Sequence, residues 1–141
     1  MRGLIHIAFF VGLFTTSNLV AQSYSFIGNE TGFKSAKISY IKGVFKGKFG
    51  LWSNKETIVV VLPSTKSPNA EGVAKYLYGT SVMGMQKYWL SLVFQGRSNP
   101  PVFLNSDQEI IEYIGKNPGA IGIINSSYKN IPAALKIEIT D

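Results

Sequence analysis

Thr57-Ile58-Val59-Val60-Val61-Leu62, closed by Pro63, is the stretch of sequence that decides the fold. A continuous β-branched and apolar run of this kind is typical of a strand buried on both faces, as in a parallel sheet with helices on each side. A second buried strand is predicted at residues 120–124. Further strands are predicted at residues 24–28, 102–104 and 135–139.

Helical patterns lie between these strands. Apolar residues recur at helical spacing over residues 35–45, with Ser35 as the expected cap. Helices are also predicted over residues 69–78, with Ser67 as cap and Pro68 at the first helical position, over residues 81–94, and from the capping box Ser106-Asp107-Gln108-Glu109 onward. Alternating strands and helices predict an α/β fold with a mostly parallel central sheet flanked by helices. The residues expected in its core include Trp52, Trp89 and Phe94.

Residues 1–21 are predicted to be an export signal. Arg2 supplies a positive charge, residues 4–14 are apolar, and Leu19-Val20-Ala21 precedes the expected cleavage point before Gln22. The apolar stretch is shorter than the roughly 20 residues of a membrane-spanning helix. Retention as an anchor is the alternative, because Leu19 is unusual three positions before a cut. Residues 22–141 are then one domain, located in the periplasm or secreted.

The composition argues against several kinds of site. The chain has no cysteine, and its one histidine, His6, lies in the expected signal. The mature chain therefore lacks the side chains of most zinc sites, of cysteine nucleophiles and of histidine-based triads. The carboxylates show no catalytic pairing, so we expect no enzyme, no metal and no organic cofactor. A secreted hydrolase would need carboxylates, or a serine and a lysine, brought together in one cleft.

The mature chain is basic. Of 14 Lys and Arg residues, removal of Arg2 leaves 13 against 8 acidic residues, a net charge near +5. Basic proteins attract anions over long range. No basic stripe with interleaved aromatic residues follows the chain, so nucleic acid is not an expected partner. The one local cluster, Lys42, Lys46 and Lys48, could dock on anionic lipid or a protein, or form only a solvated helix face.

Several short motifs resemble those of phosphate-type periplasmic substrate-binding proteins, in the family's order and with near-family spacing. They are Ile41-Lys42-Gly43-Val44-Phe45-Lys46-Gly47-Lys48 followed by Trp52, then Tyr88-Trp89, Phe94-Gln95-Gly96 and Pro100-Pro101, then Ser106-Asp107 with Ile111, and Asn117-Pro118-Gly119-Ala120-Ile121-Gly122. The similarity spans residues 24–141. It implies a type II periplasmic-binding-protein-like fold and non-covalent binding of a small oxyanion such as phosphate for an ABC transporter.

The chain differs from this family in length. Family members have two lobes that close on the anion and are about twice as long, whereas this chain has room for a single lobe. A second copy in a homodimer, or another protein, would have to supply the opposing wall. Without such a wall, binding would be weak and open.

The resemblance places the ligand loop at residues 64–69. Where family members carry Ser-Gly-Thr at a helix start, this chain reads Ser64-Thr65-Lys66-Ser67-Pro68-Asn69, without the glycine and with a proline that lacks an N–H. The candidate anion ligands are Ser64, Thr65, Ser67 and Asn69, with Lys66 adding charge. Ordinary turn and capping chemistry accounts for the same residues.

Two residues outside the loop are further candidates for the same crevice. Arg97 lies in the loop Gly96-Arg97-Ser98-Asn99, and its guanidinium suits bidentate contact with an oxyanion. Asn29 follows the first strand. The alternatives are a solvated loop charge or a surface ion pair for Arg97 and an ordinary turn residue for Asn29.

Two functions fit the sequence. The first is an exported solute-binding-protein-like domain that binds phosphate or another small oxyanion. The second is a non-catalytic interaction module that docks on a membrane sensor, transporter or envelope complex without binding solute. The single-lobe length and the altered loop favour this second function.

Overall fold

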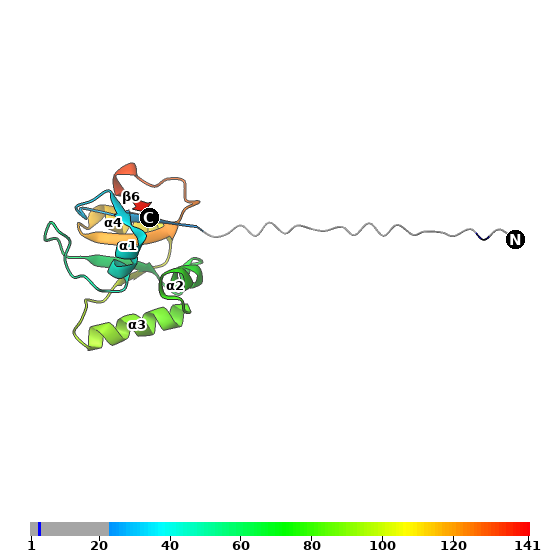
Figure 1. Cartoon of the computed structure of the whole chain (residues 1–141), viewed down its shortest axis with the longest axis horizontal. Coiled ribbons are helices and arrows are strands. Elements are labelled where there is room, and N and C mark those ends of the chain that lie inside the picture. Colours follow the sequence, from blue (N-terminus) through cyan, green and yellow to red (C-terminus); the bar gives the residue numbers. More distant parts are fainter. Residues whose placement is uncertain (1–2, 4–22) are drawn as a thin grey trace.

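The computed structural model describes residue 3 and residues 23–141, so the expected export signal at residues 1–21 lies outside the described residues, Gly3 apart. Helices cover both faces of a six-stranded sheet (Figure 1). The elements in chain order are β1 (Tyr24–Gly28), β2 (Ser35–Lys37), α1 (Ile38–Phe45), β3 (Val59–Pro63), α2 (Ala70–Tyr78), α3 (Val82–Phe94), β4 (Val102–Leu104), α4 (Asp107–Lys116), β5 (Ala120–Asn125), a 3-10 turn (Ala133–Leu135) and β6 (Lys136–Thr140).

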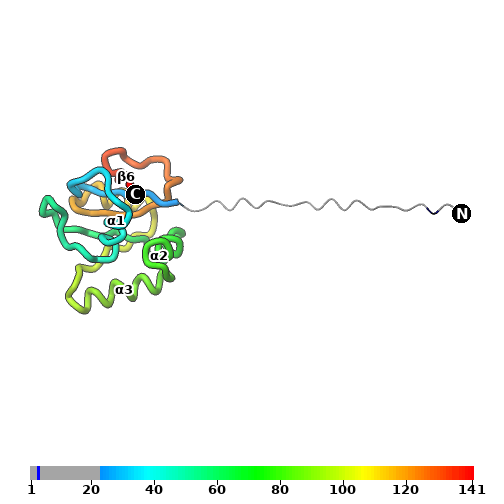
Figure 2. Tube along the Cα trace, in the orientation of Figure 1, coloured from blue at the N-terminus to red at the C-terminus, as the bar shows by residue number. Residues whose placement is uncertain are grey.

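The strand order is β2-β6-β1-β5-β3-β4. β3 pairs parallel with β4 and β5, β2 pairs parallel with β6, and β1 pairs antiparallel with β5 and β6. The sheet is therefore mixed and mostly parallel: β1 runs against the other strands of the described sheet. Figure 2 shows this early segment lying beside the late segment that forms β5.

The parallel strands β3, β4 and β5 all begin at one edge of the sheet and finish at the other. We call the end where β3, β4 and β5 begin the amino edge, and the end where they finish the carboxyl edge. Because β1 is reversed, it begins at the carboxyl edge and finishes at the amino edge: Tyr24 pairs with Asn125, and Gly28 with Ile121.

The central strands are buried on both faces. Val60 and Leu62 share a buried cluster with α1, α2 and α3, whereas Val61 shares a second cluster with α4. Successive side chains of a strand point to opposite faces, so a wholly apolar strand needs helices on both. The prediction of a strand buried on both faces is confirmed, although β3 begins at Val59 rather than at Thr57 and ends at Pro63.

The helix expected over residues 35–45 begins later than predicted. Residues 35–37 form β2, which pairs with β6 at the sheet margin, and α1 starts at Ile38 after an extended Lys37. Ser35 is therefore not a helix cap. Only Ala36 of β2 is partly buried, a strand alternation too short to be recognised in the sequence.

Phe94 was expected in the core, and this expectation is wrong. Trp52 and Trp89 are buried, but Phe94 is 83% exposed. It is the last residue of α3, five positions beyond Trp89, which places it well around the helix from the buried side.

Gly119 joins three parts of the fold. Its N–H donates to the Asn29 carbonyl (2.8 Å), and its carbonyl accepts from Trp52 Nε1 (2.9 Å) and from the Val59 N–H (3.1 Å). Its φ of +84° is a region that glycine adopts freely, and a Cβ there would lie 2.2 Å from the Thr57 carbonyl oxygen. Both the conformation and the space at this point require glycine.

Gly119→Ala is therefore expected to lower the free energy of unfolding by about 2–4 kcal/mol, because backbone strain and a backbone clash add together. The matched control is Gly79→Ala, where φ is also positive (+67°) but nothing lies within 4 Å of the added carbon. That variant should lose about 1 kcal/mol. Urea unfolding followed by tryptophan fluorescence measures both, and equal losses would contradict the role assigned to the Thr57 contact.

Tyr78 links three helices by hydrogen bonds. Trp89 Nε1 donates to the Tyr78 hydroxyl (2.8 Å), which donates to the Phe45 carbonyl (2.5 Å). Burial raises the pKa of Tyr78 well above its ordinary value of 10.0, an effect only partly offset by the Trp89 hydrogen bond. The neutral phenol is thus part of the packing between α1, α2 and α3.

Tyr78→Phe is expected to cost about 1–3 kcal/mol of unfolding free energy, because the Trp89 N–H and the Phe45 carbonyl lose their partner away from water. Tyr88→Phe is the control. The Tyr88 hydroxyl also donates to a main-chain carbonyl, that of Lys46, but it does so at the exposed surface, so this variant should change stability by about 0.5 kcal/mol or less.

The pH dependence of stability supplies a second readout for Tyr78. The pKa of Tyr78 is above 10.0 in the folded state. The stability that the neutral phenol contributes is therefore fully present below pH 10 and is lost as the pH rises through the folded-state pKa. The wild type should therefore lose more stability than Tyr78→Phe on alkaline titration. Parallel alkaline curves would contradict the buried neutral phenol.

Candidate functional site

Three loops meet at the carboxyl edge of the sheet. They follow β3, β4 and β5, and each carries short hydroxyl and amide side chains. Ligands of open α/β sheets collect at this edge, because the loops there leave the strands together. The polar side chains are Ser64, Thr65, Ser67, Asn69, Asn105, Ser106, Asn125, Ser126 and Ser127.

Serine side chains hold the loop of residues 64–69 in shape. Ser64 Oγ donates to Asn105 Oδ1 (2.5 Å) and accepts from the Lys66 N–H (3.2 Å), which joins this loop to the one after β4. Ser67 is buried, and its Oγ accepts from the Asn69 N–H (3.2 Å). The turn chemistry expected of these residues is present. It differs in detail from the prediction, since α2 begins at Ala70 with Asn69 at the cap position.

Asp107 ties the three loops together. Its Oδ1 accepts from Asn69 Nδ2 (2.8 Å), and its Oδ2 accepts from the Asn125 N–H (3.0 Å). Burial, with the Asp107 carboxylate as a further cause, raises the pKa of Tyr24 at the start of β1. In the sequence, Asp107 belongs to a capping box and to a short family-like motif, and neither pattern predicts this linking role. Its position directly after a short parallel strand was the available signal.

The loop of residues 64–69 presents a hydroxyl and an ammonium group to solvent. Thr65 and Lys66 are exposed, so the hydroxyl and the ammonium can reach a solute. The Asn69 amide is already used by Asp107, whose negative charge opposes a second anion nearby. This arrangement suits weak, open contact with a small anion rather than tight enclosure.

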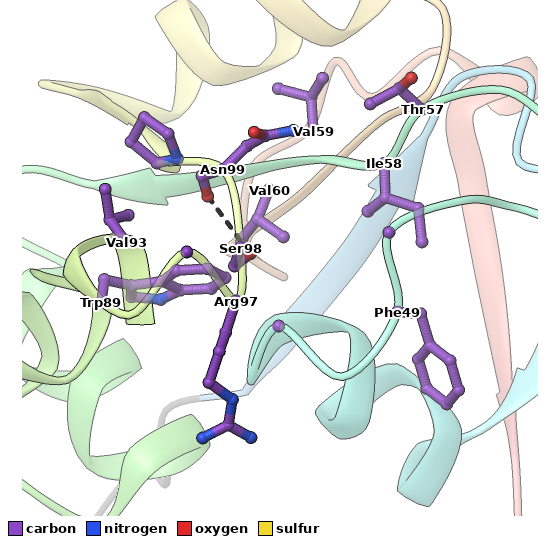
Figure 3. A pocket seen from close by; sticks show the side chains of 14 residues that line it. Phe49, Thr57, Ile58, Val59, Val60, Trp89, Val93, Arg97, Ser98 and Asn99 are labelled. Atoms are coloured by element: carbon purple, nitrogen blue, oxygen red, sulfur yellow. Dashed lines mark hydrogen bonds between the residues drawn. The ribbon is translucent and has the colours of Figure 1, made fainter. Parts of the chain in front are cut away.

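Arg97 does not lie at the carboxyl edge. Its loop leads from α3 into the start of β4, at the amino edge, where its Nη1 donates to Gln95 Oε1 at 3.5 Å. There it helps to line a cavity of about 510 Å³ together with Thr57 and Trp89 (Figure 3). In that view its guanidinium extends away from Asn99. The structure does not bring Arg97 and residues 64–69 into one site.

Asn29 is likewise at the amino edge. Its Nδ2 donates to the Ile114 carbonyl (2.9 Å) and the Gly115 carbonyl (3.5 Å), near the end of α4. The expectation that Asn29 points into the crevice of residues 64–69 assumed a parallel β1. Because β1 is reversed, Asn29 instead supports the last turn of α4.

Neither a cluster of metal ligands nor a membrane-spanning helix occurs among the described residues. Among residue 3 and residues 23–141, no three side chains of His, Cys, Asp or Glu gather as metal ligands. No helix in that part combines the length and apolar character needed to cross a bilayer.

No family model matches the chain, and no curated protein sequence matches it. Several solved structures have a similar fold. An ABC-type phosphate transport receptor from Vibrio cholerae superposes with a TM-score of 0.59 at 15% identity, over 84% of this chain and 47% of that one. A structure described as a phosphate ABC transporter substrate-binding protein with bound phosphate, from Clostridium perfringens, gives 0.57 at 18% identity, over 83% and 44%. PstS from Borrelia burgdorferi gives 0.57 at 14% identity, over 84% and 47%.

The chain thus spans less than half the length of the proteins it resembles. At these identities the similarity concerns the fold. The described chain folds like part of a phosphate-type periplasmic substrate-binding protein, as the sequence motifs predict.

Proposed function

We propose that this protein is an extracytoplasmic solute-binding domain that holds a small oxyanion, such as phosphate, at the loop of residues 64–69. The observation that carries the proposal is the position of this loop. It leaves β3 at the carboxyl edge, turns into α2, and is flanked by the polar loops after β4 and β5. The Clostridium perfringens structure of similar fold is described with bound phosphate.

The proposed mechanism is non-covalent. The Lys66 ammonium attracts the anion and the Thr65 hydroxyl donates to it. The first turn of α2 adds the partial positive charge of a helix N-terminus. Ser64 and Ser67 act indirectly, because their hydroxyls hold the main chain of the loop.

In this proposal Asp107 weakens anion binding through its negative charge. It keeps Asn69 in place but adds a negative charge beside the anion, and Thr65 and Lys66 are open to water on their outer side. Binding is therefore weak unless a second body covers the edge. An ABC transporter, named in the descriptions of the similar structures, is the class of protein that we propose as partner.

Thermal unfolding of the purified protein tests the proposal. A ligand that binds only the folded state raises Tm, so phosphate or sulfate should raise it above a chloride control of equal ionic strength. Lys66→Ala should weaken the apparent affinity about two- to fivefold, as for loss of one exposed charge contact. Both anions are needed, because only a difference between them shows selectivity.

Arg97→Ala is the matched control. It also removes one exposed cation, but at the amino edge, so it should leave the anion-dependent Tm shift unchanged. An equal loss in both variants would show a general response to net charge. An unchanged Tm at anion concentrations that saturate any weak site would refute oxyanion binding.

A further inference from the structure

Helix α3 is apolar on both of its sides. Its inner side is buried in the core through Val82, Met85, Trp89 and Leu92. Its outer side is also apolar but exposed: Met83 is 57%, Leu90 55% and Phe94 83% exposed. Several large apolar side chains exposed together on one side of a helix are typical of an interaction surface. In the described chain only the inner side of α3 is covered.

The exposed residues form one continuous strip. Met83, Lys87, Leu90 and Phe94 follow the spacing of residues that share one side of a helix, and we call them the α3 stripe. The stripe adjoins an apolar groove of about 400 Å³, which Pro100, Pro101 and Phe103 close from the direction of β4. Figure 1 shows α3 at the lower margin of the molecule, below α2. The exposure of Met83, Leu90 and Phe94 places the stripe on the outer side of the helix.

The charged side chains within the α3 stripe and just after it are positive, whereas the start of the helix carries a carboxylate: Glu71 Oε2 accepts from the Val82 N–H (3.2 Å). No Asp or Glu occurs between Glu71 and Asp107, while Lys87 lies within the stripe and Arg97 just beyond its end. The segment that abuts α3 is similar. The Tyr88 hydroxyl of α3 donates to the Lys46 carbonyl (2.7 Å), and no Asp or Glu occurs between Glu30 and Glu56. The surface is apolar, with one cation within the stripe and another just beyond its C-terminal end.

The exposed apolar side chains and the nearby cations together indicate what kind of surface covers the α3 stripe. A second copy of the chain would bring Lys87 and Arg97 against cations of its own kind, which opposes pairing through the stripe. A bilayer that contains anionic phospholipid complements both features, since acyl chains accept the apolar side chains and headgroups attract the cations. Thirteen residues make α3 roughly 20 Å long, enough to lie flat in the headgroup layer.

We propose that the α3 stripe docks this domain on the surface of an anionic phospholipid bilayer. Leu90 and Phe94 enter the boundary between headgroups and acyl chains, while Lys87 and Arg97 stay at the level of the phosphates. The inference is independent of the proposed anion site, because it uses α3 and the amino edge rather than residues 64–69.

Sedimentation of the full chain with vesicles tests this docking. Wild type should bind vesicles of phosphatidylglycerol mixed with phosphatidylcholine, more strongly than phosphatidylcholine alone, and added salt should weaken the difference. The double variant Leu90→Ser, Phe94→Ser should bind about tenfold more weakly or worse, since it loses two inserted apolar groups. Both side chains are exposed, so its Tm should stay near that of the wild type.

Two variants serve as controls. Ile139→Ser makes the same kind of change at an exposed apolar residue of β6 (39% exposed) and should leave vesicle binding unchanged. Lys66→Ala should also leave it unchanged, which separates a lipid headgroup at the α3 stripe from an anion at residues 64–69. Lys87→Glu should weaken binding only where the vesicles carry phosphatidylglycerol.

Three outcomes would overturn the proposal. The first is equal vesicle binding by the wild type and the Leu90→Ser, Phe94→Ser variant. The second is failure of the wild type to bind phosphatidylglycerol vesicles, which would point to an acidic protein partner instead. The third is a dimer, seen by light scattering, that the double variant dissociates, because a second copy would then occupy the stripe.

Discussion

The carbonyl of Gly119 is the acceptor on which the rest of this fold depends. It receives the Trp52 indole and the Val59 amide, while the Gly119 N–H reaches back to Asn29. These bonds join the end of β1, the start of β3 and the turn into β5. They hold the amino edge of the sheet together through main-chain groups and one buried indole, whereas the opposite edge carries irregular polar loops.

The reversed direction of β1 has the largest effect on the candidate site. A chain whose strands all ran one way would present Asn29 beside residues 64–69. Reversal sends Asn29 to the amino edge, where Arg97 also lies because its loop precedes β4. One predicted group of anion ligands is thereby divided between two edges. Asp107, which no anion-binding pattern would select, becomes the residue that connects the polar loops.

Local signals in the sequence predicted most of the fold. The apolar run into Pro63 and the helix cap at Ser106 depend on neighbouring residues alone, and the structure contains both. The Glu109 carboxylate accepts from the Asn105 N–H rather than from the Ser106 N–H that a capping box would use. The predictions that were wrong involve distant partners. Residues 35–37 form a strand only because β6 lies beside them, and the position of Asn29 depends on strand direction, which pairing decides. The exposure of Phe94 likewise depends on what covers α3.

The margins of the sheet have a consequence for association between molecules. The outermost strands, β2 and β4, are each three residues long, and β4 is entered through Pro100 and Pro101. Short margins, proline and nearby lysines are the features that stop a sheet from growing by adding strands of another chain. A strand of another protein is therefore not expected to pair with these outer strands through main-chain hydrogen bonds. A protein partner is expected to recognise side chains rather than the exposed main chain of the sheet.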